Sequence, residues 1–284
     1  FANELSLICQ ELGVDVWRLI NLANRHPRVD IPRPGPGVGG HCLAVDPWFL
    51  VDAAPGCTDF IQTARLRNDA MPELTADRIE QALAHLSRPA KIACLGLAYK
   101  PDTDDLRESP ALAVAKILAD RGHELAVFLP GYRTVRAGPH VAEAQSSHQF
   151  KVEMGDTFLS GEVYTLKPRA GLTLYLICRE EFFDRQRPYG TGTRDYDDND
   201  ARFIFFQKAV VELLRLTDFK ADIVHCHDWQ TSLLPIFLRE AERRYEVTLA
   251  LKTVFTIHNI AYQGIFPRKS YALTNLPAEL MIID

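Results

Sequence analysis

Three consecutive stretches decide the fold: KIACLGLAY at 91–99, ALAVAKILADR at 111–121 and HELAVFLP at 123–130. The first and third are short apolar runs of the length of buried strands, whereas the second repeats apolar residues at the helical period. Ser109 and Pro110 are typical of a helix start, and Gly122 is typical of a helix end. The order strand, helix, strand predicts a right-handed βαβ unit whose two strands are parallel.

The alternation of strands and helices continues beyond this unit. Apolar runs predict five more strands: FKVEM (150–154), GEVYTL (161–166), LTLYLIC (172–178), ADIVHC (221–226) and LKTVFTI (251–257). Two amphipathic stretches predict helices: NDARFIFFQKAVVELLRL (199–216) and WQTSLLPIFLREAERR (229–244). The pattern is typical of one Rossmann-like α/β domain over 89–284, with a parallel sheet and helices on both faces. Phe203, Phe205 and Phe206 are expected in its core.

The first part of the chain has a helical pattern instead. Apolar residues recur at helical spacing through most of 1–88, interrupted by HPRVDIPRPGPGVGGHC at 26–42, which is dense in proline and glycine. Asp15 is placed to cap one helix, and another is expected to begin near Asp46 and Pro47. The predicted fold class is therefore α/β, with a helical N-terminal segment followed by a Rossmann-like parallel-sheet domain.

Composition excludes several classes of function. The chain has 284 residues, 47% hydrophobic and 24% charged, enough for about two globular domains. Its net charge of −5 gives no basic surface for nucleic acid, and no apolar run approaches the ~20 residues that span a bilayer. Six cysteines without a CxxC pair suit reduced thiols, so we expect a soluble, cytoplasmic protein. Phe1 in place of Met predicts that the sequence begins inside a longer chain.

The glycine-rich stretch contains a literal GxGxxG at 35–40, the spacing of a dinucleotide-binding loop. Such a loop needs a strand directly before it, and IPRP at 31–34 cannot supply the backbone donors of a strand. Cys42 follows two residues after the glycines. A thiol beside a helix N-terminus can serve as a nucleophile, with Asp46 placed to orient water or substrate. A buried structural cysteine is the alternative.

Residues 1 to about 126 resemble the nucleotide-sugar dehydrogenases. The motifs that carry the resemblance are NELSLICQELGVDVWRLINLANRHPRV (3–29), PGPGVGGHCLAVDPWF (34–49), ARLRNDAMP (64–72) and LGLAYKPDTDDLRESPAL (95–112). The resemblance implies NAD-dependent oxidation of UDP-N-acetylmannosamine to its uronic acid. It also implies that Cys42 is the nucleophile that forms the thiohemiacetal and thioester, with Asp46 assisting.

The same resemblance assigns substrate binding to five further residues: Gly37, Gly39, Gly40, Lys100 and Arg107. The last two match the start of the family's UDP-binding domain. The family's NAD-binding domain and catalytic lysine lie upstream of the position that matches Asn3, so we expect this chain to bind no cofactor itself. The family dimerises through its central helices, which predicts a homodimer through 4–13 and 59–86.

Residues from about 127 to 284 resemble a second family, the bacterial glycogen synthases, which are starch synthases of the ADP-glucose type. The matching strings are VFLPGYRTV (127–135), LTLYLICREEFFDRQRPYG (172–190), DDNDARFIFFQKA (197–209), DIVHCHDWQTSLLP (222–235) and KTVFTIHNIAYQGIFP (252–267). This resemblance implies glucosyl transfer from ADP-glucose to an α-1,4-glucan by a two-domain glycosyltransferase of Rossmann type. The expected partners are nucleotide sugars and α-glucan, with neither nucleic acid nor membrane.

Polar residues follow two of the predicted strands, at the edge where an open α/β sheet places its ligands. Those at the first strand are His225, His227 and Asp228, and those at the second are His258 and Asn259. By the resemblance, His258 contacts the donor glucose and Asp228 lies on the acceptor side. Three residues are then expected to shape the glucan site: Asn259, Tyr262 and Gln263.

Two other functions remain open on the residues alone. The HCHD string at 225–228 has the HxH spacing of a metal-dependent hydrolase, although a third and a fourth ligand are not evident. His225 is expected to be a buried, hydrogen-bonded histidine instead. A non-catalytic glucan-binding module is the second alternative, because acceptor residues such as Tyr262 are present.

The junction between the two resemblances falls between Leu112 and Pro130, inside the βαβ unit. Residues 91–99 take the place of the first strand of the synthase, so we expect a continuous sheet across the junction. The synthase's phosphate-binding glycine loop is replaced by KPDTDD at 100–105, whose acidic residues repel a diphosphate. Because each family is represented in part, we expect these residues alone to complete neither reaction.

Overall fold

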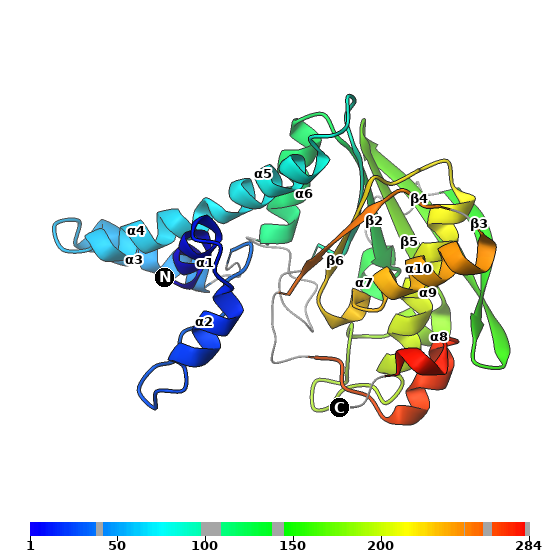
Figure 1. The fold of residues 1–284 in the computed structure, drawn as a ribbon. Helices are drawn as coiled ribbons and strands as arrows, with labels where there is room; N and C mark the ends of the chain where they lie inside the picture. Colours follow the sequence, from blue (N-terminus) through cyan, green and yellow to red (C-terminus); the bar gives the residue numbers. More distant parts are fainter. Residues whose placement is uncertain (38–41, 98–108, 138–144, 247, 258–262, 282–284) are drawn as a thin grey trace. The chain divides into compact units, whose positions relative to one another are not determined.

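A computed structural model describes the chain except for residues 38–41, 98–108, 138–144, 247, 258–262 and 282–284. The chain divides into two compact units (Figure 1). The first comprises Phe1–Ala84 with Asp105–Ile117, and the second comprises His85–Asp104 with Leu118–Asp284. Among the described residues, no helix combines the length and the apolar character needed to cross a membrane.

The first unit is helical. Its helices are α1 (Ala2–Glu11), α2 (Val16–Ala23), α3 (Cys42–Ala53), α4 (Asp59–Asp69), α5 (Met71–Leu83) and most of α6 (Pro110–Asp120). The cap at Asp15 is confirmed, because its carboxylate accepts hydrogen bonds from the amides of Trp17 and Arg18 at 2.8 and 3.2 Å. The predicted start of α3 is wrong: the helix begins at Cys42, not near Pro47. Pro47 lies in the second turn and has no N–H to donate, yet the helix continues to Ala53.

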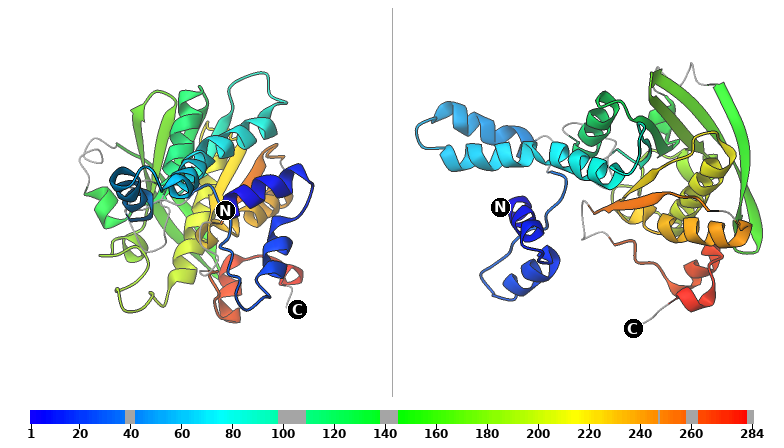
Figure 2. Two further views of the ribbon diagram at one scale, coloured as in Figure 1. Left: turned by 90° about the vertical axis from the view of Figure 1, so that its left-hand side faces the viewer. Right: turned by 45° about the horizontal axis from the view of Figure 1, so that its top comes forward.

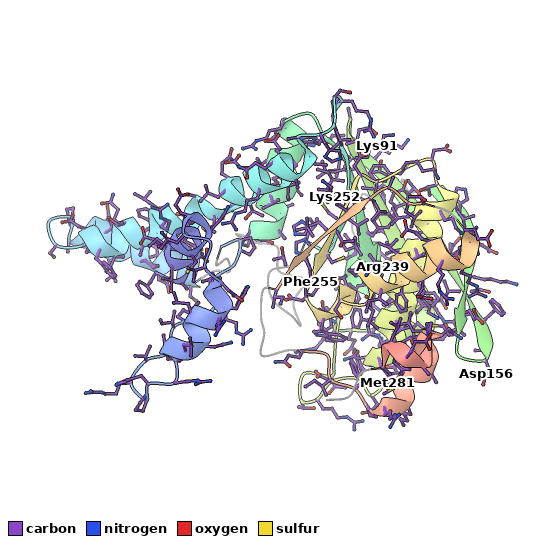
Figure 3. The ribbon with its side chains drawn as sticks, in the orientation of Figure 1. Lys91, Asp156, Arg239, Lys252, Phe255 and Met281 are labelled. Atoms are coloured by element: carbon purple, nitrogen blue, oxygen red, sulfur yellow. The ribbon has the colours of Figure 1, made fainter. Side chains whose placement is uncertain are left out.

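Among the described residues, the second unit is built on a seven-stranded sheet of order β3-β4-β5-β2-β1-β6-β7. The strands are β1 (Lys91–Leu95), β2 (Glu124–Pro130), β3 (Gln145–Met154), β4 (Thr157–Arg169), β5 (Leu172–Cys178), β6 (Ile223–His227) and β7 (Lys252–Thr256). From β5 to β7 the neighbours are parallel, and Lys91 and Lys252 mark the amino ends of β1 and β7 (Figure 3). The predicted α/β fold class is confirmed.

Two strands depart from the parallel arrangement that the sequence predicts. β3 pairs with β4, and β4 with β5, in antiparallel fashion. Their connections are only residues 155–156 and 170–171, whereas a parallel pair needs a crossover of about a dozen residues or more. Gly155 and Gly171 have φ values of +58° and +75°, which such tight turns favour. Asp156 lies at the tip of the first hairpin (Figure 3).

The main core lies between the sheet and two helices on one of its faces, α9 (Asn199–Leu216) and α10 (Leu234–Tyr245) (Figures 1 and 2). Phe205 and Phe206 of α9 are 0% and 2% exposed, as expected of core residues. A smaller cluster around Leu176 lies on the opposite face.

The remaining short elements are α7 (Arg133–Arg136), α8 (Glu180–Phe183), η2 (Trp229–Thr231), η3 (Arg268–Thr274) and η4 (Ala278–Leu280).

The sheet is continuous across the junction between the two resemblances, because β1 pairs with both β2 and β6. Asp222 joins the amino ends of these strands. Its carboxylate accepts hydrogen bonds from the Arg88 guanidinium at 2.8 and 3.0 Å and from the Lys91 amide at 2.7 Å. Its backbone pairs with the Lys91 carbonyl and the Lys252 amide. Although burial raises the pKa of Asp222, the hydrogen bonds from Arg88 and Lys91 hold it below its ordinary value.

Candidate functional site

Asp228 immediately follows the carboxyl end of β6. Its φ of 55° and ψ of −174° lie in a region that residues with a side chain rarely occupy. Two hydrogen bonds hold this backbone. The Asp228 amide donates to the Thr256 carbonyl at 2.9 Å, and the Asp228 carbonyl accepts from the Thr231 amide at 3.1 Å. Backbone strain persists where the surroundings impose it, and such residues cluster at functional sites.

Two buried histidines lie beneath Asp228 in β6. The rings of His225 and His227 are 4.1 Å apart between centroids, and the residues are 2% and 8% exposed. His225 Nε2 lies 2.8 Å from the Thr256 hydroxyl. The Thr231 hydroxyl accepts from the His227 amide at 2.7 Å and donates to the His227 carbonyl at 2.8 Å. Thr231 and Thr256 were not among the predicted site residues, because a hydroxyl residue near the end of a strand is a weak sequence signal.

The histidine pair does not form a metal site in the part of the chain that the structure describes. There, no group of three or more His, Cys, Asp or Glu side chains could hold an ion. The Nε2 atom of His225 is engaged with Thr256, as expected of a buried, hydrogen-bonded histidine. The geometry therefore gives no support to a metal-dependent hydrolase.

The segment that follows β7 returns to the neighbourhood of Asp228 through Trp229. Gly264 has a φ of +62°, and a Cβ added to it would lie 2.6 Å from the Trp229 indole. Phe266 contacts the same indole, with ring centroids 5.3 Å apart. Gln263 is exposed and directly precedes Gly264, so this predicted residue lies close to the neighbour of Asp228. The remaining predicted residues of this segment, His258, Asn259 and Tyr262, lie outside the described residues.

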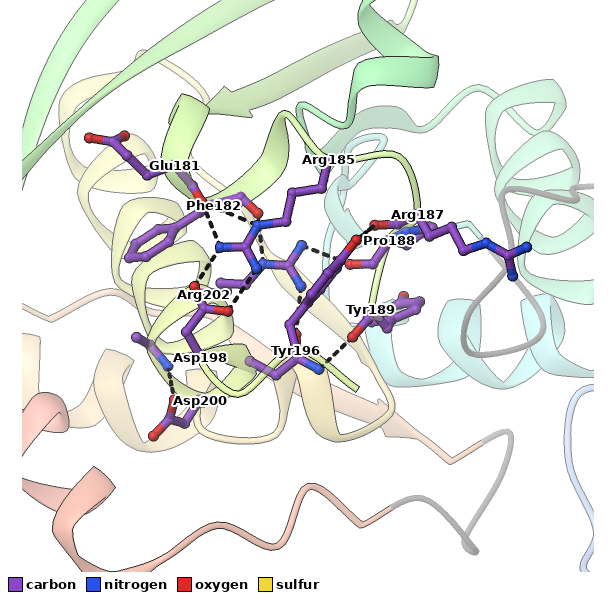
Figure 4. Close-up of polar contacts among 12 residues, drawn as sticks. Glu181, Phe182, Arg185, Arg187, Pro188, Tyr189, Tyr196, Asp198, Asp200 and Arg202 are labelled. Atoms are coloured by element: carbon purple, nitrogen blue, oxygen red, sulfur yellow. Dashed lines mark hydrogen bonds and ion pairs between the residues drawn. The ribbon is translucent and has the colours of Figure 1, made fainter. Parts of the chain in front are cut away.

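A buried arginine, which the sequence analysis missed, orders the loop next to this site (Figure 4). Arg202 of α9 is 0% exposed, and burial lowers its pKa. Its guanidinium donates to the Phe182 and Pro188 carbonyls at 2.7 Å and to Asn199 Oδ1 at 2.5 Å. Arg185 makes a bidentate pair with Asp198 in the same loop. The next residue, Phe203, contacts Trp229 with ring centroids 4.9 Å apart, which links the loop to the site.

Cys42 and Asp46 lie in the first unit. Both are exposed, and Cys42 is the first residue of α3. Residues four apart share one face of a helix, so the thiol and the carboxylate belong to the same side. Gly37 has a φ of +125° and packs against the Asn68 carbonyl and the Pro110 ring, where a side chain would be strained. The other predicted substrate residues, Gly39, Gly40, Lys100 and Arg107, lie outside the described residues.

The glycine-rich stretch does not fit a dinucleotide cofactor. A pyrophosphate-binding glycine loop directly follows a strand. Residues 24–37, which lead into this stretch, contain no strand, so the described part of the first unit offers NAD no cradle of this kind.

The six thiols differ in accessibility. None is in a disulfide, and Cys42 and Cys57 are exposed whereas the other four are buried. Burial raises the pKa of Cys94 and of Cys226 to about 12 and that of Cys178 to about 11, so these thiols stay protonated at neutral pH. Cys42 is therefore one of two thiols that a solute can reach.

Two family models match the chain in different places. The starch synthase catalytic domain matches residues 111–284, and the central domain of the UDP-glucose/GDP-mannose dehydrogenase family matches residues 1–70. Glycogen synthase from Opitutus terrae is 60% identical over 172 residues, 61% of this chain and 36% of that protein. UDP-N-acetyl-D-mannosamine dehydrogenase from Yersinia pestis is 58% identical over 127 residues, 42% of this chain and 30% of that protein.

The structural comparison agrees with the fold. The catalytic domain of starch synthase IV from Arabidopsis thaliana, solved bound to ADP and acarbose, matches with a TM-score of 0.55 and 23% identity, over 68% of this chain and 38% of that one. The chain spans about a third of the length of the curated relatives it matches. The two relatives are a synthase and a dehydrogenase, so the comparisons favour neither a glucan-binding module nor a hydrolase. Through residues 111–284 the chain belongs to the starch synthase catalytic domain family, and its first 70 residues are similar to the central domain of the UDP-glucose/GDP-mannose dehydrogenase family.

Proposed function

We propose that residues 111–284 take part in glucosyl transfer from ADP-glucose to an α-1,4-glucan. The observation that supports this most is the strained Asp228 at the carboxyl end of β6, inside the match to the starch synthase catalytic domain. Open α/β sheets bind their ligands at this end of the strands. A carboxylate on a fixed backbone can accept hydrogen bonds from sugar hydroxyls without first being ordered.

Within that function, Asp228 is proposed to contact the acceptor glucan and His258 the donor glucose. Three further residues are proposed to shape the glucan site: Asn259, Tyr262 and Gln263. The packing of Gly264 on Trp229 supports this placement, because it brings the segment back to the residue after Asp228. The 284-residue polypeptide spans about a third of either relative, and we propose that it binds acceptor but completes neither reaction by itself.

Replacing Asp228 by glycine is expected to separate stability from binding. Glycine adopts this backbone conformation without steric penalty, so the free energy of unfolding should rise by about 1–2 kcal/mol. Loss of the carboxylate should weaken the binding of maltohexaose by about tenfold. Urea denaturation and isothermal titration of the 284-residue protein measure the two effects.

Two matched variants sharpen this test. Asp228→Asn keeps the strained backbone and removes the charge, so it should lose binding without gaining stability. Asp218→Asn removes an exposed charge from the segment before β6 and should bind maltohexaose normally. If the unaltered protein does not bind maltohexaose, or if both Asp228 variants bind it as well as the unaltered protein does, the proposed acceptor role is wrong.

For residues 1–88 we propose the chemistry of the nucleotide-sugar dehydrogenases, with 89–284 as a separate domain whose residues 89–126 begin the UDP-binding part. The Cys42 sulfur would add to the C6 aldehyde of the sugar, forming an S–C bond while the carbonyl oxygen takes up a proton, with Asp46 assisting. Five residues are proposed to bind the UDP-sugar: Gly37, Gly39, Gly40, Lys100 and Arg107. The family implies NAD, but we assign no hydride step to these residues and propose that they bind no cofactor alone.

The Cys42 proposal predicts site-selective protection from alkylation. Iodoacetamide should modify Cys42 and Cys57 and spare the four buried thiols. UDP-N-acetylmannosamine at saturating concentration should slow the modification of Cys42 by about fivefold or more, because bound substrate removes the free form. Peptide mass spectrometry over a time course measures both rates. Cys57 is the internal control, and equal rates for Cys42 with and without the nucleotide sugar would contradict the proposal.

We also propose a homodimer through residues 4–13 and 59–86. Large apolar side chains of these helices are exposed, including Leu12 at 69% and Phe60 at 83%. The proposal rests on these exposed side chains, because large exposed apolar patches mark protein interfaces.

Light scattering after size exclusion tests the dimer. The expected mass is twice the 32.0 kDa of one chain, and Phe60→Glu should shift it to that of one chain, because a buried carboxylate at an interface is costly. Ile265→Glu, at an exposed apolar residue of the second unit, is the control and should leave the dimer intact. A single-chain mass for the unaltered protein contradicts the proposal.

The cytoplasm is the proposed location. All six cysteines are unpaired, as is usual in a reducing compartment. Both proposed reactions also use nucleotide sugars as substrates.

A further inference from the structure

An open pocket of about 560 Å³ lies in the second unit beside the tip of the β3–β4 hairpin. It is lined by side chains of β3, α9 and α10, by Phe158 at the start of β4, and by residues 274–276. None of the residues assigned above to the Asp228 site lines it. A pocket of this size is in the range of small-molecule sites.

Eight charged side chains line this pocket. The cations are Lys151, Lys208, Arg215, Arg243 and Arg244, and the carboxylates are Glu153, Glu212 and Glu240. Each carboxylate is paired with an arginine: Arg244 with Glu153 at 2.7 Å, Arg215 with Glu212 at 2.9 Å and Arg243 with Glu240 at 2.8 Å. The two lysines therefore give the lining a surplus of two positive charges.

Lys208 is fixed in place by neutral groups. Its Nζ donates to the Glu153 carbonyl and to Asn275 Oδ1, both at 2.6 Å, and lies 5.7 Å from the centre of the Phe237 ring. An ammonium has three N–H donors, so one is left for a ligand. Asn275 is itself held by two hydrogen bonds with the backbone of Gly155, at 2.8 and 3.0 Å. The hairpin turn thus positions the lysine before any ligand arrives.

Aromatic side chains lie beside these charges. Phe158 is 66% exposed and Tyr245 is 39% exposed, and the Arg215 guanidinium lies 4.4 Å from the Tyr245 ring centre. An exposed ring next to surplus positive charge suits a ligand with an apolar face and an anionic group. We propose that this pocket binds a hexose phosphate, with its phosphate at Lys208 and Lys151 and the sugar ring against Phe158.

Isothermal titration of the 284-residue protein with glucose 6-phosphate tests this directly. We expect saturable binding with one site per chain, and weaker binding of inorganic phosphate, which lacks the ring. Lys208→Met and Lys151→Met should each lower the affinity about tenfold, because each removes a charged hydrogen-bond donor. Lys208→Arg should restore part of the affinity. Lys167→Met, on an exposed lysine of β4 outside the pocket, is the matched control and should bind normally.

Lys151 is exposed, so Lys151→Met keeps the test valid even if Lys208→Met fails to fold. The proposal is overturned if the unaltered protein does not bind glucose 6-phosphate at millimolar concentration. It is equally overturned if Lys151→Met and Lys208→Met bind it as tightly as the control does.

The pH dependence provides a second readout. Burial lowers the pKa of Lys208 to about 8, with Glu153 opposing and Arg244 reinforcing that shift. The other charged groups that face it are Lys151 of β3, Glu212 and Arg215 of α9, and Glu240 and Arg243 of α10. Sulfate is the probe for this measurement, because it stays a dianion between about pH 7 and 9.5. The affinity of the pocket for sulfate should fall over this pH range, as Lys208 loses its proton. Lys208→Met should show no such fall, and an equal fall in that variant would contradict the assignment.

Discussion

The carboxylate of Asp222 joins the amino ends of neighbouring strands in the sheet of the second unit. It accepts hydrogen bonds from Arg88 and the Lys91 amide, while its own backbone pairs with Lys91 on one side and Lys252 on the other. β1 lies in the part that resembles dehydrogenases, whereas β6 and β7 lie in the starch synthase match. Residues 92–95 serve as a central strand for two reasons. Parallel pairing uses backbone groups, and the two faces of the strand are buried and require only apolar side chains.

The register of β6 and β7 determines which residues meet at the carboxyl ends of these two strands. Because β6 and β7 are in register, the Asp228 amide reaches the Thr256 carbonyl, and Thr231 closes the turn that follows. Together these contacts impose the strained backbone that presents the Asp228 carboxylate. Gly264 packs on Trp229 from the segment beyond β7, which brings the preceding residue, Gln263, close to the neighbour of Asp228.

The sequence predicted the order of elements well, because apolar runs and helical periodicity are local signals. It did not predict the antiparallel hairpin around residues 155–156, although a two-residue connection with glycine already excludes a parallel pair. The conformation of Asp228 could not be predicted, because it is imposed by a neighbouring strand rather than by the residue type. The pocket around Lys208 was likewise hidden, since segments as far apart as 151–153 and 274–276 line it.

Hydrogen exchange measured by mass spectrometry, on the unaltered protein and on Asp222→Asn, tests most directly whether one sheet spans the two families. The variant loses the charge that Arg88 and the Lys91 amide contact. Protection from exchange should therefore fall together in peptides covering 91–95 and 223–227, by about tenfold for each 1.4 kcal/mol lost from the free energy of opening. Asp218→Asn is the control and should leave the protection of both peptides unchanged. Faster exchange in 223–227 alone, with 91–95 unaffected, would contradict a shared sheet.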